Sequence, residues 1–173
     1  MGGNREQFDH ELEVIEAKVI TLFGMVAEDL IVATQALLGD RAETAEVLVG
    51  REQVIDSLYL EVENLAARGI LLQAPVAGDL RLLLTVLRVV PELERSHDLI
   101  VHICFRAVRD GGELPPRIAA LAGQMAGLAS VMWRQAADAW YQRDHSAAAV
   151  LATLRDEMSE LHAALTPRSP TRL

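Results

Sequence analysis

The sequence predicts an all-α fold, an antiparallel three-helix bundle followed by an incomplete repeat of two helices. Composition is the first reason: 51% of the 173 residues are hydrophobic but only 4% are aromatic, and Leu, Ala and Val supply most of the apolar side chains. The small numbers of Gly (11) and Pro (6) argue against a β-sandwich or a Gly-rich loop enzyme. The second reason is spacing, because apolar residues recur every three or four positions over runs of about 30 residues.

The first helix is predicted over residues 5–38. Its apolar stripe stops at Gly39, which is typical of a helix C-cap, and Asp40 follows as a capping residue. We expect the following residues to form the stripe that faces the core: Leu12, Ile15, Val19, Leu22, Val26, Leu30, Ala33 and Leu37.

The second helix is predicted over residues 41–73 and the third over residues 76–109. Ala74 and Pro75 separate them, because proline disfavours the helical conformation of the residue that precedes it. Helices of about 30 residues are roughly 45 Å long, and short turns fold three such helices into an antiparallel bundle. We therefore assign residues 1–112 to one three-helix repeat.

Two shorter helices are predicted next, one ending near residue 142 and one over residues 145–165 with Asp144 as its N-cap. A shift of 103 positions places Leu22 on Met125, Leu30 on Trp133 and Leu37 on Trp140, so these helices echo the first two. Residues 113–165 thus form a second repeat without a third helix, which must pack on the first bundle or on another subunit. Residues 166–173 carry two prolines and no apolar period, and we expect a disordered tail.

The charge balance excludes several classes of partner. The chain has 16 basic and 25 acidic residues and a formal net charge of −9, so we expect no nucleic-acid binding. The most apolar stretch, residues 80–90, is interrupted by Arg81 and Arg88 and is shorter than the roughly 20 residues of a membrane span. Cys104 is the single cysteine and the first residues contain no apolar segment, so we expect a cytoplasmic protein without a signal peptide and without direct membrane insertion.

Carboxylates on the apolar faces of two helices are the strongest indication of chemistry. Glu52 lies on the inward stripe of the second helix with Asp56 four residues later, and Glu94 and Asp98 repeat that spacing on the third helix. Ionised carboxylates on a buried face cost several kcal/mol unless cations compensate them. A metal ion is one such cation, with His102 as a further nitrogen ligand.

A plainer interpretation is that these acids lie at the edge of a groove, solvated or paired with Arg51, Arg88 or Arg95. His97 is expected to be a packed helix residue, and Trp133 and Trp140, one heptad apart, suit core packing. The sequence shows no nucleotide-binding glycine motif, no zinc motif and no catalytic triad, so we predict that the protein is not an enzyme.

Three motifs resemble the PhoU family. Residues 75–81 read Pro-Val-Ala-Gly-Asp-Leu-Arg, residues 92–98 read Glu-Leu-Glu-Arg-Ser-His-Asp, and residues 52–58 read Glu-Gln-Val-Ile-Asp-Ser-Leu. They are similar to that family's P-V-A-x-D-L-R, L-E-R-I-G-D and E/D-x-x-x-D-x-L motifs, in the same order. The resemblance covers roughly residues 8–109.

The resemblance implies a regulatory protein that restrains phosphate uptake and phosphate-responsive signalling. It implies contacts with the ATPase subunit of a phosphate ABC transporter and with a sensor histidine kinase, and formation of a homodimer. It also implies a cluster of transition metal ions, iron or zinc, bound by Glu52, Asp56, Glu94 and Asp98, and it makes Arg95 a structural residue. The two alternatives are a metal-binding or storage protein that acts alone and a metal-free structural adaptor.

The chain departs from the family pattern near the proposed site. Ser96 and His97 replace Ile-Gly, and His97 either crowds a neighbouring helix or adds a ligand; His102 replaces an asparagine. Pro91 removes one backbone hydrogen bond a turn before Glu94. In the second repeat, Arg155 and Ser159 occupy the acid positions, so we expect at most one metal site per chain.

Overall fold

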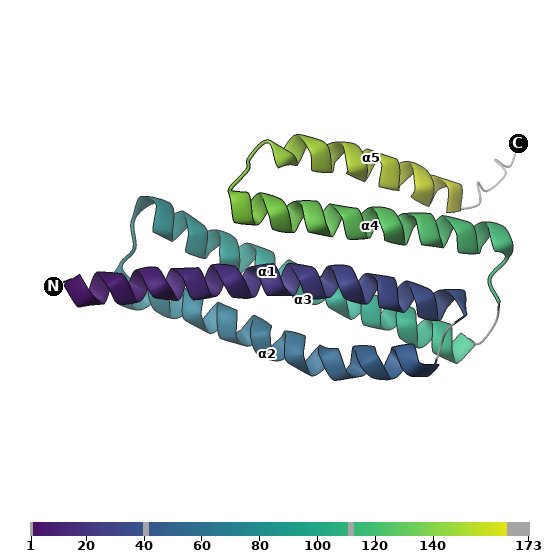
Figure 1. Ribbon diagram of the computed structural model, residues 1–173, viewed down its shortest axis with the longest axis horizontal. Coiled ribbons are helices and arrows are strands. Elements are labelled where there is room, and N and C mark those ends of the chain that lie inside the picture. Colours follow the sequence, from purple (N-terminus) through teal and green to yellow (C-terminus); the bar gives the residue numbers. More distant parts are fainter. Residues whose placement is uncertain (1, 40–41, 111–112, 166–173) are drawn as a thin grey trace, which may run out of the picture.

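The protein consists of five helices in a computed structural model that describes residues 2–39, 42–110 and 113–165 (Figure 1). The helices are α1 (Gly2–Leu38), α2 (Ala42–Gln73), α3 (Ala77–Asp110), α4 (Pro116–Gln142) and α5 (Ala147–Leu165). Every predicted helix is present, and its ends differ from the predicted ones by three residues or fewer. The predicted tail, residues 166–173, lies outside the described residues.

The central helix of the fold is α1. It packs against α2, α3 and α4, α2 and α3 pack against each other, and α5 packs on α4. In Figure 1 the α4–α5 hairpin lies along one side of α1, and α3 crosses behind it. This arrangement confirms the predicted three-helix bundle followed by a two-helix hairpin.

The core follows a stricter pattern than the stripe expected from the sequence. A buried stripe of α1 alternates steps of four and three from end to end: Phe8, Leu12, Ile15, Val19, Leu22, Val26, Asp29, Ala33 and Ala36. Phe23 and Ala27 are buried beside this stripe. Leu30 and Leu37, which we placed on the inward stripe, are partly buried and pack against this core. The fully buried positions beside them are Asp29 and Ala36, because the core repeat of α1 is seven residues long.

Helix α3 follows the same repeat. Its buried stripe is Leu83, Val86, Val90, Leu93, His97, Ile100, Cys104 and Ala107. Leu84, Leu99, Ile103 and Phe105 of the same helix are exposed. The helix continues through Pro91 without a break.

The helix ends follow the predicted chemistry. Ala74 takes a left-handed conformation (φ 45°) just before Pro75 and ends α2. At the other hairpin, the Asp144 carboxylate accepts hydrogen bonds from the Ser146 backbone N–H (2.8 Å) and hydroxyl (2.7 Å), and these bonds lower the pKa of Asp144. Asp144 therefore caps the start of α5 as predicted.

Aromatic contacts attach α4 to the first bundle. Phe23 of α1 lies 6.0 Å from Trp133 and 6.4 Å from Trp140, measured between ring centroids. Both tryptophans pack against the core cluster, as their heptad spacing indicated. A groove of about 860 Å³ remains open between α3 and the α4–α5 hairpin.

Within the described residues, one helix is long and apolar enough to cross a membrane by length and composition, the segment Arg5–Leu38 of α1. This segment is not the stretch 80–90 that the sequence indicated as the most apolar. In the fold, one stripe of α1 faces the other helices and includes the buried Asp29.

Candidate functional site

The predicted carboxylates lie on two helices that pack against each other. Glu52 continues the core alternation of α2, between buried Leu48 and Ile55, and is itself partly exposed. Asp56 is exposed one turn further along. On α3, Glu94 and Asp98 are both partly buried.

Glu94 lies in the field of two other carboxylates. Burial raises the pKa of Glu94, and the charges of Asp98 and Asp56 raise it further, while His97 acts in the opposite direction. Asp56 belongs to α2 and the other two acids to α3, and these helices pack against each other. We call the surface that carries Asp56, Glu94 and Asp98 the acidic face. The mutual repulsion favours either a proton or a cation at this place.

Tyr59 and Glu63 extend this face and were not singled out from the sequence. Burial and the charges of Glu63 and Glu94 raise the pKa of the Tyr59 phenol, which also hydrogen-bonds to Glu63. Tyr59 follows Asp56 by three residues, and Glu63 follows Tyr59 by four. This three-and-four spacing places the three side chains along one side of α2, so it could have indicated both residues from the sequence.

The acidic face is not a formed metal centre. In the described parts of the chain, no three Asp, Glu, His or Cys side chains lie close enough together to hold one metal ion. The plainer interpretation also needs revision, because Arg51 pairs with other acids, and neither Arg88 nor Arg95 forms an ion pair with a described residue. The face therefore carries net negative charge that Arg51, Arg88 and Arg95 do not neutralise through ion pairs in the described structure.

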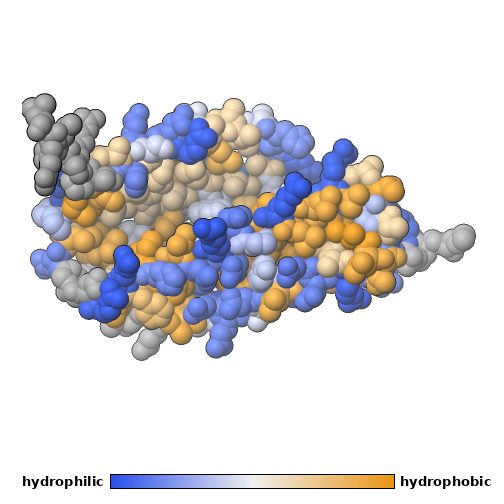
Figure 2. All heavy atoms as spheres, turned by 180° about the vertical axis from the view of Figure 1, so that it is seen from behind, coloured by the Kyte–Doolittle hydropathy of each residue, from blue (hydrophilic) through white to orange (hydrophobic). Residues whose placement is uncertain are grey.

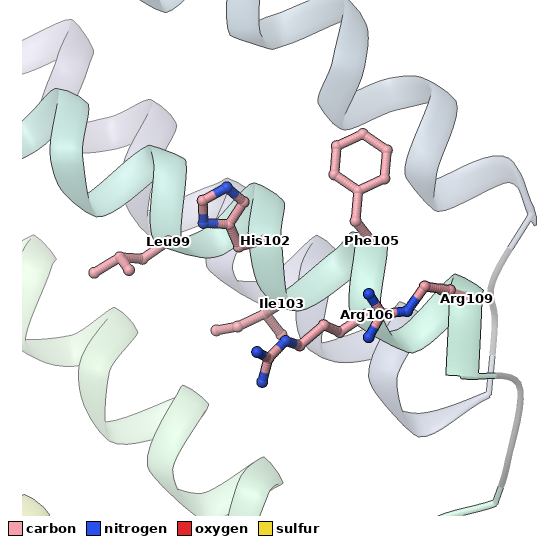
Figure 3. A pocket seen from close by; sticks show the side chains of 6 residues that line it. All are labelled: Leu99, His102, Ile103, Phe105, Arg106 and Arg109. Carbon is pink, nitrogen blue, oxygen red and sulfur yellow. The ribbon is translucent and has the colours of Figure 1, made fainter.

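His102 lies on the outer side of α3, one helical turn after Asp98. It is exposed and lines an open groove of about 810 Å³ on the outer side of α3, together with Leu99, Ile103, Phe105, Arg106 and Arg109 (Figure 3). In this position the imidazole belongs to a basic and apolar surface.

A buried ionic cluster lies beneath the acidic face and was missed by the sequence analysis. Asp29 of α1 is fully buried, and its carboxylate contacts the Arg51 guanidinium of α2 at 2.5 Å. Its other oxygen lies 3.2 Å from Nε2 of His97 on α3, which is also buried, although the two atoms are not aligned as a hydrogen bond. Glu28 lies 3.3 Å from the same guanidinium.

The cluster fixes three helices at one level. Burial lowers the pKa of the Arg51 guanidinium, but hydrogen bonding and charge from Asp29 and the charge of Glu28 outweigh burial and raise it overall. Arg51 immediately precedes Glu52, and His97 lies between Glu94 and Asp98. The cluster thus joins α1 to both acid-bearing helices at the residues next to the acid pairs.

His97 shows what the departure from the family motif does. Its side chain is 1% exposed and turns toward Asp29, so it neither joins the acidic face as a ligand nor is excluded by α1. The packed role expected for His97 is therefore confirmed. Asp29 itself could have been found from the strict four-and-three alternation of α1, which places a carboxylate at a core position.

The second repeat carries no equivalent of this face. Arg155 and Ser159 are exposed at the corresponding positions of α5, and Arg155 pairs with the adjacent Asp156 at 2.9 Å. Asp156 and Glu160 are exposed as well.

Together these features define a class, helical bundle proteins that carry paired carboxylates on adjacent long helices. A sequence model described as the PhoU domain matches residues 19–107, just over half of the chain and the part that contains both acid pairs. The chain belongs to the PhoU family.

Curated relatives carry related names. A "Phosphate-specific transport system accessory protein PhoU homolog" of Synechocystis sp. is 38% identical over 54% of this chain and 42% of its own length. A homolog of the same name from Clostridium acetobutylicum is 28% identical over 91% of this chain and 73% of its own. The Escherichia coli accessory protein PhoU is 30% identical over 59% and 42%.

A solved structure supports the fold. The chain matches the crystal structure of PhoU from Pseudomonas aeruginosa with a TM-score of 0.85 and 22% identity, over 91% of this chain and 76% of that one. The chain spans less than half the length of the Synechocystis and Escherichia coli relatives and about three quarters of the two that match most of it.

The buried cluster leads to a prediction about stability. Asp29→Ala leaves the Arg51 and His97 side chains without their shared anion and should lower the free energy of unfolding by about 3 kcal/mol, measured by urea denaturation. Replacing Asp29 by Val and His97 by Leu together should recover most of this loss, because the buried imidazole is also removed and the partly exposed Arg51 keeps Glu28 as a partner. Glu61→Ala, which removes an exposed partner of Lys18, is the control and should cost a few tenths of a kcal/mol. An equal cost for Asp29→Ala and Glu61→Ala would contradict the role of the cluster.

The raised pKa of Glu94 leads to a prediction about pH. Because the pKa of Glu94 is higher in the folded state, the folded protein binds this proton more tightly than the unfolded chain. The ionised Glu94 therefore lowers the free energy of unfolding at pH values above its folded-state pKa. Below the ordinary value of 4.5 the carboxyl is protonated in both states and the effect is absent. Glu94→Gln should therefore stabilise EDTA-treated protein at pH 7.5, and the gain should vanish as the pH falls toward that value. Glu92→Gln, at an exposed position of the same helix, should change nothing. The same gain for Glu94→Gln at both ends of the pH range would contradict the proposed repulsion.

Proposed function

We propose that this protein restrains phosphate uptake and phosphate-responsive signalling through protein–protein contacts, as a PhoU-type accessory protein. The observation that carries the proposal is the family match over residues 19–107, supported by relatives named as accessory proteins of phosphate-specific transport. The partners implied by the resemblance are the ATPase subunit of a phosphate ABC transporter and a sensor histidine kinase.

The proposal includes a homodimer. Its support is the small amount of burial in the second repeat, where α5 packs on α4 and exposed apolar side chains include Val131 (39% exposed), Tyr141 (76%) and Val150 (50%). A hairpin that buries so little of its surface is favoured by contact with another subunit.

The proposal also includes a transition metal ion, iron or zinc, at the acidic face. Glu52, Asp56, Glu94 and Asp98 would hold it, and carboxylate oxygens are suitable ligands for such ions. The raised pKa of Glu94 beside Asp98 and Asp56 supports this assignment, because a bound cation would relieve the repulsion among these acids. Side-chain rotations would have to complete the site, since no three ligand groups are already together in the described residues.

A second candidate function is the metal-free adaptor. The observation that favours it is the position of His97, which is turned into the core toward Asp29 and is therefore not at the acidic face. In this alternative the acidic face serves as a negatively charged contact surface.

The regulatory proposal predicts a phenotype. Deleting the gene should raise phosphate uptake and phosphate-responsive expression in cells grown with abundant phosphate, because a restraint has been removed. Uptake of radiolabelled phosphate and a reporter gene measure the two effects. Unchanged uptake and expression in phosphate-rich medium would contradict the proposal.

The metal proposal predicts stoichiometric metal in the purified protein. Elemental analysis after mild purification should find bound iron or zinc, and replacing both Glu94 and Asp98 by Ala should remove it. The exposed acids Asp156 and Glu160 of α5 provide the matched control, because their replacement by Ala removes the same charge elsewhere. Wild-type protein that carries no metal and shows no affinity on titration would leave the adaptor as the function.

A further inference from the structure

The outer surface of α3 carries a row of basic side chains at one position of the heptad. If the buried residues Leu83, Val90, His97 and Cys104 define position a, and Val86, Leu93, Ile100 and Ala107 define position d, position f lies farthest from the core. Every f position of the helix is basic and exposed: Arg81, Arg88, Arg95, His102 and Arg109. We call this row the basic ridge.

The ridge keeps one orientation along the helix. Because the core positions of α3 repeat every seven residues, every f position has the same relation to the rest of the bundle. Successive members are about 10.5 Å apart, and the whole ridge is about 42 Å long. The residues are seven apart in the chain, which explains why no basic cluster was apparent from the sequence.

Three arginines of the ridge have no acidic partner in the described parts of the chain. Among the described residues, Arg81, Arg88 and Arg95 form no ion pair, whereas the exposed arginines Arg5 and Arg143 pair with acids at 3.0 and 2.7 Å. Over residues 84–106, position f is flanked by positions b and c, where the acids are Asp98 and Glu92; the other residues there are Leu84, Pro91, Phe105, Thr85, Leu99 and Arg106. Arg81, Arg88 and Arg95, exposed on a chain of net charge −9, attract anionic groups.

Apolar side chains flank the ridge near its C-terminal end. Leu99 is 57% exposed, Phe105 49% and Ile103 38%. Figure 3 shows Leu99, Ile103 and Arg106 projecting from one side of α3 and Phe105 from the other, around His102. In Figure 2, which shows the side of the molecule where α3 lies in front, blue hydrophilic side chains cross the surface in a diagonal row with orange apolar ones beside it. Arginine and aromatic residues around an apolar centre are typical of protein interfaces.

We propose that the basic ridge binds an amphipathic helix of another protein that presents carboxylates at heptad spacing beside apolar residues. The spacing of the arginines matches that of Asp or Glu repeated every seven residues on a partner helix, and the groove lined by Leu99, Ile103 and Phe105 receives its apolar side chains. Nucleic acid fits less well, because the chain as a whole is strongly acidic and the ridge is interleaved with exposed apolar residues. This inference does not depend on phosphate regulation or on metal.

A designed peptide tests the proposal. The probe is a helical peptide of about 28 residues, the length of the ridge, with Glu at every seventh position and Leu beside it; a second peptide carries Lys in place of Glu. Fluorescence anisotropy with the full-length protein should show binding of the acidic peptide that weakens with salt, and no binding of the basic one. Replacing Arg88 and Arg95 by Glu should weaken binding about tenfold or more.

The matched control replaces Arg68 and Arg134 by Glu. These exposed arginines of α2 and α4 lie outside the ridge, and their replacement changes the net charge equally, so binding should stay within about twofold. Thermal unfolding of both variants confirms that they are folded.

Four outcomes would overturn the proposal. They are no binding of the acidic peptide, equal weakening by both pairs of substitutions, binding of a DNA duplex of the same length as tightly as the peptide, and a wild-type dimer in sedimentation that the Arg88→Glu and Arg95→Glu substitutions dissociate. The third outcome would identify a nucleic-acid surface and the fourth a contact between two copies of this chain.

Discussion

Burial of one side of α1 against three other helices is the constraint on which the rest of the structure depends. The alternation of four and three residues from Phe8 to Ala36 is continuous, and α2, α3 and α4 each pack against α1. Because the same repeat runs through α3, positions seven residues apart keep a constant environment. The acidic face, the buried cluster and the basic ridge are all consequences of that constancy.

The seven-residue core repeat of α1 buries the carboxylate of Asp29, which costs free energy of folding. A buried carboxylate is tolerated only where polar or positively charged groups contact it, and Arg51 and His97 supply these contacts from two other helices. The His97 side chain stands where the family motif has glycine, so the departure in α3 and the acid in α1 form one structural unit. This unit lies immediately beside the two acid pairs, and their relative position therefore depends on it.

The two charged surfaces of α3 differ in sign and in chemistry. Glu94 and Asp98 face α2 and Asp56, where repulsion among partly buried acids favours a cation. Arg81, Arg88 and Arg95 face solvent, where exposed cations favour an anionic partner. The two sides of one helix thus carry opposite charge, and the two proposals made above assign a cation to one side and an anionic partner to the other.

The sequence by itself determined the helices, their approximate ends, the three-helix bundle with the two-helix hairpin that follows it, and the family, because apolar spacing, Gly, Pro and the E-x-x-x-D motifs are local signals. It also indicated that Glu94 and Asp98 share a stripe with apolar residues. Only the tertiary structure decided that Asp29 is buried more deeply than Leu30, that His97 turns toward Asp29, and that His102 lies with the arginines. Successive residues on a helix point in directions that differ by about 100°. If the core stripe is assigned one residue away from its true position, different polar side chains are predicted to contact one another. Only the packing of the neighbouring helices decides which side of each helix faces the core.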